Sequence, residues 1–87
     1  MTGEEFKAAR AVFGATIGRR LSQADMAQLI GLSDPSGNGK DTVRKWEDGD
    51  GPSGPVSTLV SLAIDGLVSG KRDVDAFITQ WILDGLE

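Results

Sequence analysis

The sequence predicts an all-α fold of five helices, and three observations support this class. Apolar residues recur three and four positions apart in each segment between breaks, which is the spacing of one helix face. No segment sustains the alternation of apolar and polar residues that a half-buried strand shows. Breaks rich in glycine, proline, serine and asparagine lie at 34–39, 49–54 and 69–70. The 87 residues make one small domain, which buries only about 60% of its unfolded surface.

The first two helices have recognisable starts. Residues 2–5 read Thr-Gly-Glu-Glu, which is a capping-box pattern. Apolar residues follow at helical spacing at Phe6, Ala9, Phe13 and Ile17. We therefore expect the first helix to run from about residue 3 into the GATIGRR stretch at 14–20. Ser22 is the predicted cap of the second helix, and Asp25 in its first turn complements the helix dipole. The apolar face of this helix consists of Met26, Leu29 and Ile30.

A polar loop and a short third helix come next. Residues 34–39 (DPSGNG) predict an exposed loop, because they hold proline, serine, asparagine and two glycines. The third helix is expected at about 40–47. Val43 and Trp46 lie three residues apart on its buried side, which leaves charged residues for its outer side. Trp46 could also stack on a base, but its spacing with Val43 favours packing in the core.

The last two helices are both amphipathic. Pro55 suits the first turn of the fourth helix. The apolar stripe of that helix consists of Val56, Leu59, Val60, Ala63 and Leu67. The apolar face of the fifth helix consists of Val74, Phe77, Ile78, Trp81 and Ile82. Such a wide face must be buried somewhere, and two alternatives stay open: it packs on the first and fourth helices, or it meets a second copy of the chain.

Composition excludes several classes of site. The chain has no cysteine and no histidine, so it has no disulfide, no Cys/His zinc site and no Ser-His-Asp triad. We expect no enzymatic activity, no cofactor and no metal. The apolar runs are too short for a membrane span of about 20 residues, and the first five residues do not start a signal peptide. We therefore expect a cytoplasmic protein without a membrane partner.

Charge is distributed unevenly along the chain. The net charge is −4, which by itself argues against binding to nucleic acid. Residues 7–45, however, hold seven basic and three acidic residues, a balance of +4. Residues 46–87 hold two basic and eight acidic residues, a balance of −6. The basic charge thus gathers in the part of the chain that contains the second and third predicted helices.

The segment from Leu21 to Gly49 resembles the Cro/repressor-type helix-turn-helix family. The matching positions are Gln23, Ala27, Gly31, Ser33, Val43, Trp46, Glu47 and Gly49. The resemblance covers 29 of 87 residues and implies that the protein binds double-stranded DNA through the major groove. Small Ala27 permits close approach of the two helices, and Gly31 can adopt a positive φ in the turn. The chain departs from the family pattern in a turn about six residues longer, at 34–41, and in an excess at 15–20.

The resemblance also implies which residues read bases. The positions of Lys40, Asp41 and Lys45 carry much of the base contact in the family. Arg44 joins them on the predicted outer side of the third helix. Lysine and arginine can bond O6 and N7 of guanine, and aspartate can accept from N4 of cytosine. The alternative is an ordinary charged helix surface.

Other residues are candidates for contact with the DNA backbone. The resemblance implies that Gln23 bonds a phosphate and supports the third helix. Ser33 and Thr42 could contact phosphate or simply cap a helix. Arg19 and Arg20 could clamp the backbone or could be solvated loop residues. In the long turn, Asn38 with Gly39 could present backbone N–H groups to a phosphate.

These observations predict a DNA-binding transcriptional regulator that acts as a repressor. They also divide the chain into two parts. Residues 1–70 form the predicted DNA-binding domain with a phage-repressor-like core and an extended turn. Residues 71–87 form the C-terminal amphipathic helix, which serves core packing or dimerisation. The expected partners are double-stranded DNA and a second copy, in a homodimer that includes the C-terminal helix. The alternative is a protein-interaction adaptor or an antitoxin that uses the same fold to bind a protein partner.

Overall fold

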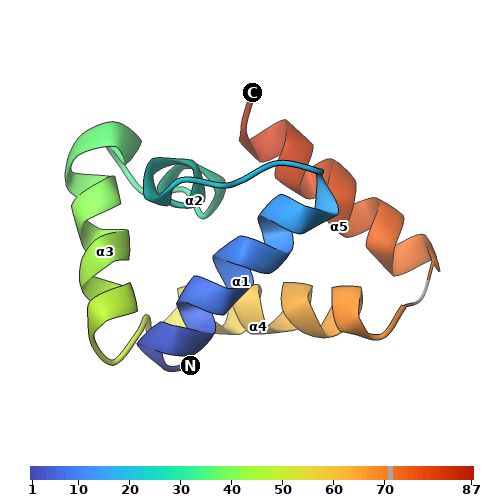
Figure 1. Cartoon of the computed structure of the whole chain (residues 1–87), viewed down its shortest axis with the longest axis horizontal. Helices are drawn as coiled ribbons and strands as arrows, with labels where there is room; N and C mark the ends of the chain where they lie inside the picture. The colour runs from blue at the N-terminus through green and yellow to red at the C-terminus, as the bar shows by residue number, and fades with distance from the viewer. Residues whose placement is uncertain (71) are drawn as a thin grey trace.

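The computed structural model describes residues 1–70 and 72–87, and this part of the chain contains five α-helices, one short π-helical turn and no strand. The elements are α1 (Gly3–Thr16), α2 (Gln23–Leu29), η1 (Pro35–Gly39), α3 (Lys40–Asp48), α4 (Gly54–Val68) and α5 (Arg72–Gly85). The predicted all-α class is confirmed. Figure 1 shows α3 at one end of the longest axis, and the end of α4 with the start of α5 at the other. In this part of the chain, every helix is too short or too polar to cross a membrane.

Both predicted N-terminal caps are present. The Thr2 hydroxyl accepts a hydrogen bond from the Glu5 backbone N–H at 3.1 Å, and the Glu5 carboxylate accepts from the Thr2 N–H at 2.9 Å. Ser22 and Asp25 form the same reciprocal pair at 3.0 Å in each direction. Each box satisfies N–H groups that the first turn of a helix leaves without a partner. The first helix ends at Thr16, before the end of the stretch we expected it to enter.

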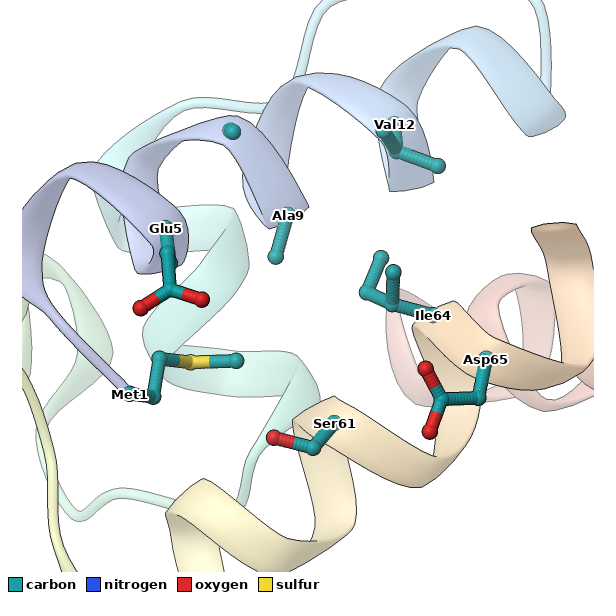
Figure 2. Close-up of a pocket in the computed structure, with 8 residues that line it drawn as sticks. Met1, Glu5, Ala9, Val12, Ser61, Ile64 and Asp65 are labelled. Atoms are coloured by element: carbon teal, nitrogen blue, oxygen red, sulfur yellow. The ribbon is translucent and has the colours of Figure 1, made fainter.

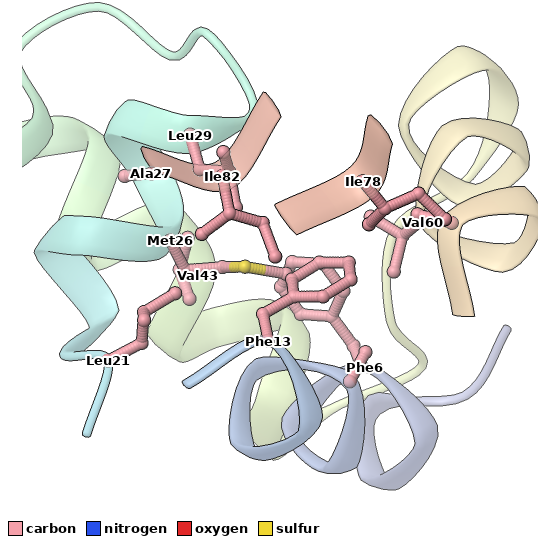
Figure 3. Packing of buried hydrophobic residues seen from close by; sticks show 12 residues of the cluster. Phe6, Phe13, Leu21, Met26, Ala27, Leu29, Val43, Val60, Ile78 and Ile82 are labelled. Carbon is pink, nitrogen blue, oxygen red and sulfur yellow. The ribbon is translucent and has the colours of Figure 1, made fainter. Parts of the chain in front are cut away.

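The hydrophobic core draws side chains from all five α-helices (Figure 3). Its fully buried large side chains are Phe6, Phe13, Leu21, Met26, Val43, Val60 and Ile82. The predicted close approach at Ala27 is also present. A Cβ atom added to Gly39 would lie 3.2 Å from the Ala27 Cβ, so small residues are needed on both sides of this contact.

The C-terminal helix is part of this core. It packs on α1, α2 and α4, and Ile82 is completely buried. The Trp81 ring meets Phe13 edge to face, with ring centroids 5.8 Å apart. Of the two alternatives for the apolar face of α5, the structure therefore shows packing on the core. Phe77 is an exception, because it is 75% exposed, and on α4 the predicted stripe residue Leu59 is exposed as well. Of the predicted C-terminal segment 71–87, residue 71 lies outside the described residues.

The long turn is not the loop we expected. Asp34 has a φ of 50°, its carbonyl accepts from the N–H groups of Gly37 and Gly39, and its carboxylate accepts from the Asn38 N–H at 3.2 Å. These bonds close the turn η1 and bury Gly39. The prediction that the N–H groups of Asn38 and Gly39 are available for a phosphate is therefore wrong, because Asp34 already accepts from both.

Candidate nucleic-acid interface

The inner side of α3 is fixed by apolar contacts. Val43 is completely buried, and the Trp46 ring meets Phe6 edge to face with centroids 5.7 Å apart. This contact is the core role that we expected for Trp46. The N-terminus of α1 also approaches the end of α3 closely, because a Cβ atom at Gly3 would collide with the backbone carbonyls of Trp46 and Glu47. The orientation of α3 about its own axis is therefore determined by the core.

A buried polar cluster also attaches α3 to the rest of the molecule. The Arg10 guanidinium donates to both oxygens of the Glu47 carboxylate, at 2.8 and 3.0 Å, and to the Leu21 carbonyl at 2.7 Å. The Gln23 side-chain amide donates to Glu47 at 3.2 Å. The Glu47 side chain is only 3% exposed, so these partners replace the hydrogen bonds to water that its carboxylate loses on burial. We call Arg10, Gln23 and Glu47 the polar clamp, since it joins α1, α2 and α3.

Arg10 was not among the residues predicted from the sequence, although the spacing of residues around it and around Glu47 carried a signal. Glu47 follows Val43 by four positions and therefore lies on the buried side of the third helix. A carboxylate at such a position needs a cation or several hydrogen-bond donors. Arg10 follows Phe6 by four positions and precedes Phe13 by three, so it borders the apolar face of the first helix. The two patterns mark both residues as charged side chains that need a partner, without showing that they meet each other. The contact with Gln23 agrees with its expected role in supporting the third helix.

The outer side of α3 carries the predicted base-reading residues. Lys40, Asp41, Arg44 and Lys45 are all exposed. The Arg44 guanidinium lies 3.4 Å from the Asp41 carboxylate, with both side chains more than half exposed. A pair of this kind contributes only about 0.2–0.5 kcal/mol, so both side chains can exchange it for other partners. The helix thus presents three cations and, with exposed Asp48 at its end, two carboxylates to the surroundings.

The residues predicted to contact the DNA backbone differ in their exposure and in their partners. Ser33 before η1 and Asn38 within it are exposed, whereas Thr42 is half-buried and its hydroxyl donates to the Asn38 carbonyl at 2.9 Å. Arg19 is exposed and lies 3.8 Å from the Asp25 carboxylate. Thr42 therefore links α3 to η1 in this structure, which agrees with the local structural role that we kept open for it.

Arg20 belongs to a basic hollow that includes a residue we did not predict. The hollow has a volume of about 270 Å³ and is lined by Lys7, Arg10, Ala11, Arg20 and Leu21. Its lining contains no acidic residue. Glu47 balances the charge of Arg10, so Lys7 and Arg20 supply the net positive charge. Lys7 was not predicted as a site residue, because an exposed lysine on a helix has no distinguishing sequence pattern by itself.

A second pocket lies between α1 and α4 and contains none of the predicted residues (Figure 2). It has a volume of about 240 Å³, and Glu5 and Asp65 contribute carboxylates to its lining. Acidic groups repel phosphate, so this pocket does not extend the candidate interface. The interface consists of the outer side of α3, the residues beside η1 and the basic hollow. No family model matches the chain, and neither does any curated protein or solved structure with which it was compared.

Proposed function

We propose that this protein binds double-stranded DNA sequence-specifically, with α3 in the major groove, and represses transcription by occluding a promoter. The observation that carries the proposal is the row of exposed charged side chains on α3, a helix whose opposite side is fixed by Val43 and the polar clamp. A rigidly held helix with an exposed polar side can present fixed donors to base edges. The resemblance to the Cro/repressor-type family at Gln23, Glu47 and Gly49 supports the same reading.

The chemistry of the outer side of α3 suits base recognition. Lys40, Arg44 and Lys45 are donors that can bond O6 and N7 of guanine. Asp41 is an acceptor that can bond N4 of cytosine. Each well-formed bidentate contact of this kind contributes about 1–3 kcal/mol to discrimination against the wrong base. The mixture of donors and one acceptor favours a site that contains G·C base pairs.

The remaining candidates would hold the DNA backbone. Lys7 and Arg20 give the basic hollow its net positive charge, which suits a phosphate. Arg19, Ser33 and the Asn38 side chain are exposed and can reach a second phosphate position. Such contacts carry no sequence information, but they position α3 and make binding depend on salt.

Two copies on one operator complete the proposal. Helix-turn-helix proteins place two recognition helices in successive major grooves, about 34 Å apart. The Cα atoms of this molecule span 34 × 26 × 20 Å, so two copies fit side by side at that spacing. Together they would cover the width of a promoter element and exclude other proteins from it.

Selection of bound sites from random duplex DNA tests the proposal. We expect a two-fold symmetric motif. The Lys45→Ala variant should lose about 1–3 kcal/mol of binding free energy and relax specificity at one position. The matched variant Lys7→Ala should instead weaken binding to all duplexes alike and reduce the salt slope by about 1. If Lys45→Ala binds the selected duplex as tightly as the unchanged protein does, and the same holds for random duplexes, then α3 is not the helix that reads the bases.

The same measurements separate the alternative function. The net charge of −4 favours a protein-interaction adaptor that keeps the fold without reading DNA. In that case the selection yields no motif, and any residual DNA binding depends little on salt. A steep salt dependence together with a symmetric motif supports the repressor.

A further inference from the structure

An apolar groove runs between α4 and α5, away from the candidate interface. It has a volume of about 290 Å³, and Leu59, Leu62, Phe77 and Trp81 are part of its lining. Leu62 is 66% exposed and Phe77 is 75% exposed, so large apolar side chains face solvent here. None of the residues that line the groove belongs to α3 or to the basic hollow. The groove can therefore be used at the same time as the DNA-binding side.

A second hollow extends this groove along α5. It has a volume of about 440 Å³ and shares Phe77 and Trp81 with the groove, and it adds Gln80, Asp84 and Gly85. We call the two hollows together the α4–α5 groove. Asp84 follows Asp73 by eleven positions on α5, which corresponds to about 16 Å along the helix axis. This length accommodates about three turns of an α-helix lying in the groove.

Two carboxylates lie near the ends of the α5 segment that forms the groove: Asp84 is part of the lining, and Asp73 comes directly before the lining residue Val74. Asp73 precedes Phe77 by four positions, and Asp84 follows Phe77 by seven, so the three residues share one side of α5. Both aspartates are exposed. From Asp73 to the last residue the sequence carries four acidic residues and no basic one, whereas the two residues directly before Asp73 are basic. An occupant with basic residues at both ends of an apolar stripe complements this arrangement.

A second copy of the chain does not complement it. If α5 of another copy lay antiparallel in the groove, Asp73 would approach the other copy's Asp84. In the parallel orientation, each aspartate would approach its own equivalent. Like charges in close juxtaposition oppose association in either case. The two copies in the proposed DNA complex would then approach each other through another surface.

We propose that the α4–α5 groove docks a basic amphipathic helix of a partner protein, about three turns long. The apolar stripe of that helix covers Leu62, Phe77 and Trp81, and its lysine or arginine residues pair with Asp73 and Asp84. The inference does not depend on the proposed DNA binding, because the two surfaces share no residue.

Two synthetic helical peptides of about eighteen residues test this proposal with the full chain. The first has leucine on one side and lysine on the other, and the second has glutamate in place of lysine. By calorimetry we expect the lysine peptide to bind with one-to-one stoichiometry and the glutamate peptide not to bind. Phe77→Ser should weaken binding about tenfold or more, as expected for a central aromatic contact. Leu83→Ser is the matched control, because Leu83 is 42% exposed and lies outside the groove lining.

The charge part of the proposal has its own variant. Replacement of both Asp73 and Asp84 by asparagine should weaken binding of the lysine peptide several-fold and flatten its salt dependence. Circular dichroism checks that every variant is folded. Equal binding of both peptides, or binding that Phe77→Ser does not change, would overturn the proposal. Sedimentation that shows a dimer which Phe77→Ser dissociates would also overturn it, because the groove would then hold a second copy.

Discussion

The two halves of this molecule are held together in different ways, and their surfaces differ accordingly. In the half formed by α1, α2 and α3, a buried polar clamp of Arg10, Gln23 and Glu47 supplements the core. In the half formed by α4 and α5, the contacts are mainly apolar, with Ile78 and Ile82 buried. The first half exposes charged residues on α3, whereas the second exposes Leu62, Phe77 and other large apolar side chains.

This difference shows that residues which a helix does not need for packing in the core can indicate function. A short helix needs only one buried side, and on α3 that side is completed by Val43, Trp46 and Glu47. Its remaining residues are free to carry charges that suit DNA. On α5 the core uses Ile78, Ile82 and part of Trp81, so the exposed ring of Phe77 serves no evident packing purpose. The two surfaces therefore suit partners of different chemistry.

The strongest test of the comparison is removal of α5 by truncation after Gly70. We expect the truncated chain to be unfolded, because α5 contributes Ile82 to the centre of the core and packs on α1, α2 and α4. Circular dichroism and chemical denaturation measure the outcome. Ile82→Ala provides a milder version and should cost about 2–5 kcal/mol of the free energy of unfolding. A truncated chain that unfolds cooperatively would instead show that the core formed by α1–α4 is stable without α5.

Removal of the polar clamp should have the next largest effect. In Glu47→Ala the Arg10 guanidinium keeps its charge in a site where it is only 16% exposed, without its carboxylate. Breaking a buried pair from one side costs about 3–5 kcal/mol. The control is Asp48→Ala, one residue later and exposed, which should change stability by less than about 0.5 kcal/mol. If both variants unfold at the same denaturant concentration, the clamp does not stabilise the first half.

Much of the fold followed from local patterns in the sequence. The capping residues Thr2 and Ser22 predicted the starts of two helices because their hydrogen bonds are made within one turn. The breaks rich in glycine and proline predicted where α3 ends and where α4 begins. These features depend on neighbours in the sequence. They could be found without knowledge of the tertiary structure.

The parts that were missed depend on contacts between distant residues or on unusual backbone geometry. The bond from Arg10 to Glu47 spans 37 positions, and no local pattern shows that the two side chains meet. The hollow around Lys7 and Arg20 likewise forms only when α1 packs beside the segment before α2. In the long turn, composition indicated a loop, but the left-handed conformation of Asp34 allows it to accept three N–H groups.

The turn η1 offers an intermediate test of whether this region belongs to the rigid half. Asp34→Ala removes the carboxylate that accepts from the Asn38 N–H and leaves a residue that disfavours the positive φ. Loss of such a cap costs about 0.5–2 kcal/mol. Chemical denaturation measures the change, and exposed Ser36→Ala is the control. An unchanged midpoint for Asp34→Ala would mean that η1 is not coupled to the stability of α2 and α3.

The smallest expected effect concerns the capping box at the start of α1, on the surface of the first half. The hydrogen bond that the Glu5 carboxylate accepts from the Thr2 backbone N–H is the main cause that lowers the pKa of Glu5 below its ordinary value of 4.5, and the Thr2 side chain lowers this pKa further. A carboxyl whose pKa is lower in the folded state stabilises the fold above its unfolded pKa, and this contribution is lost as the pH falls through the folded value. The melting temperature should therefore differ between the unchanged protein and Glu5→Gln at pH 7, and the difference should shrink as the pH falls below 4.5. Glu4→Gln is the matched control, because Glu4 lies one residue earlier and takes no part in the capping box. A difference for Glu5→Gln that stays constant with pH would show that the ionised carboxylate adds nothing beyond the hydrogen bond that glutamine can also accept.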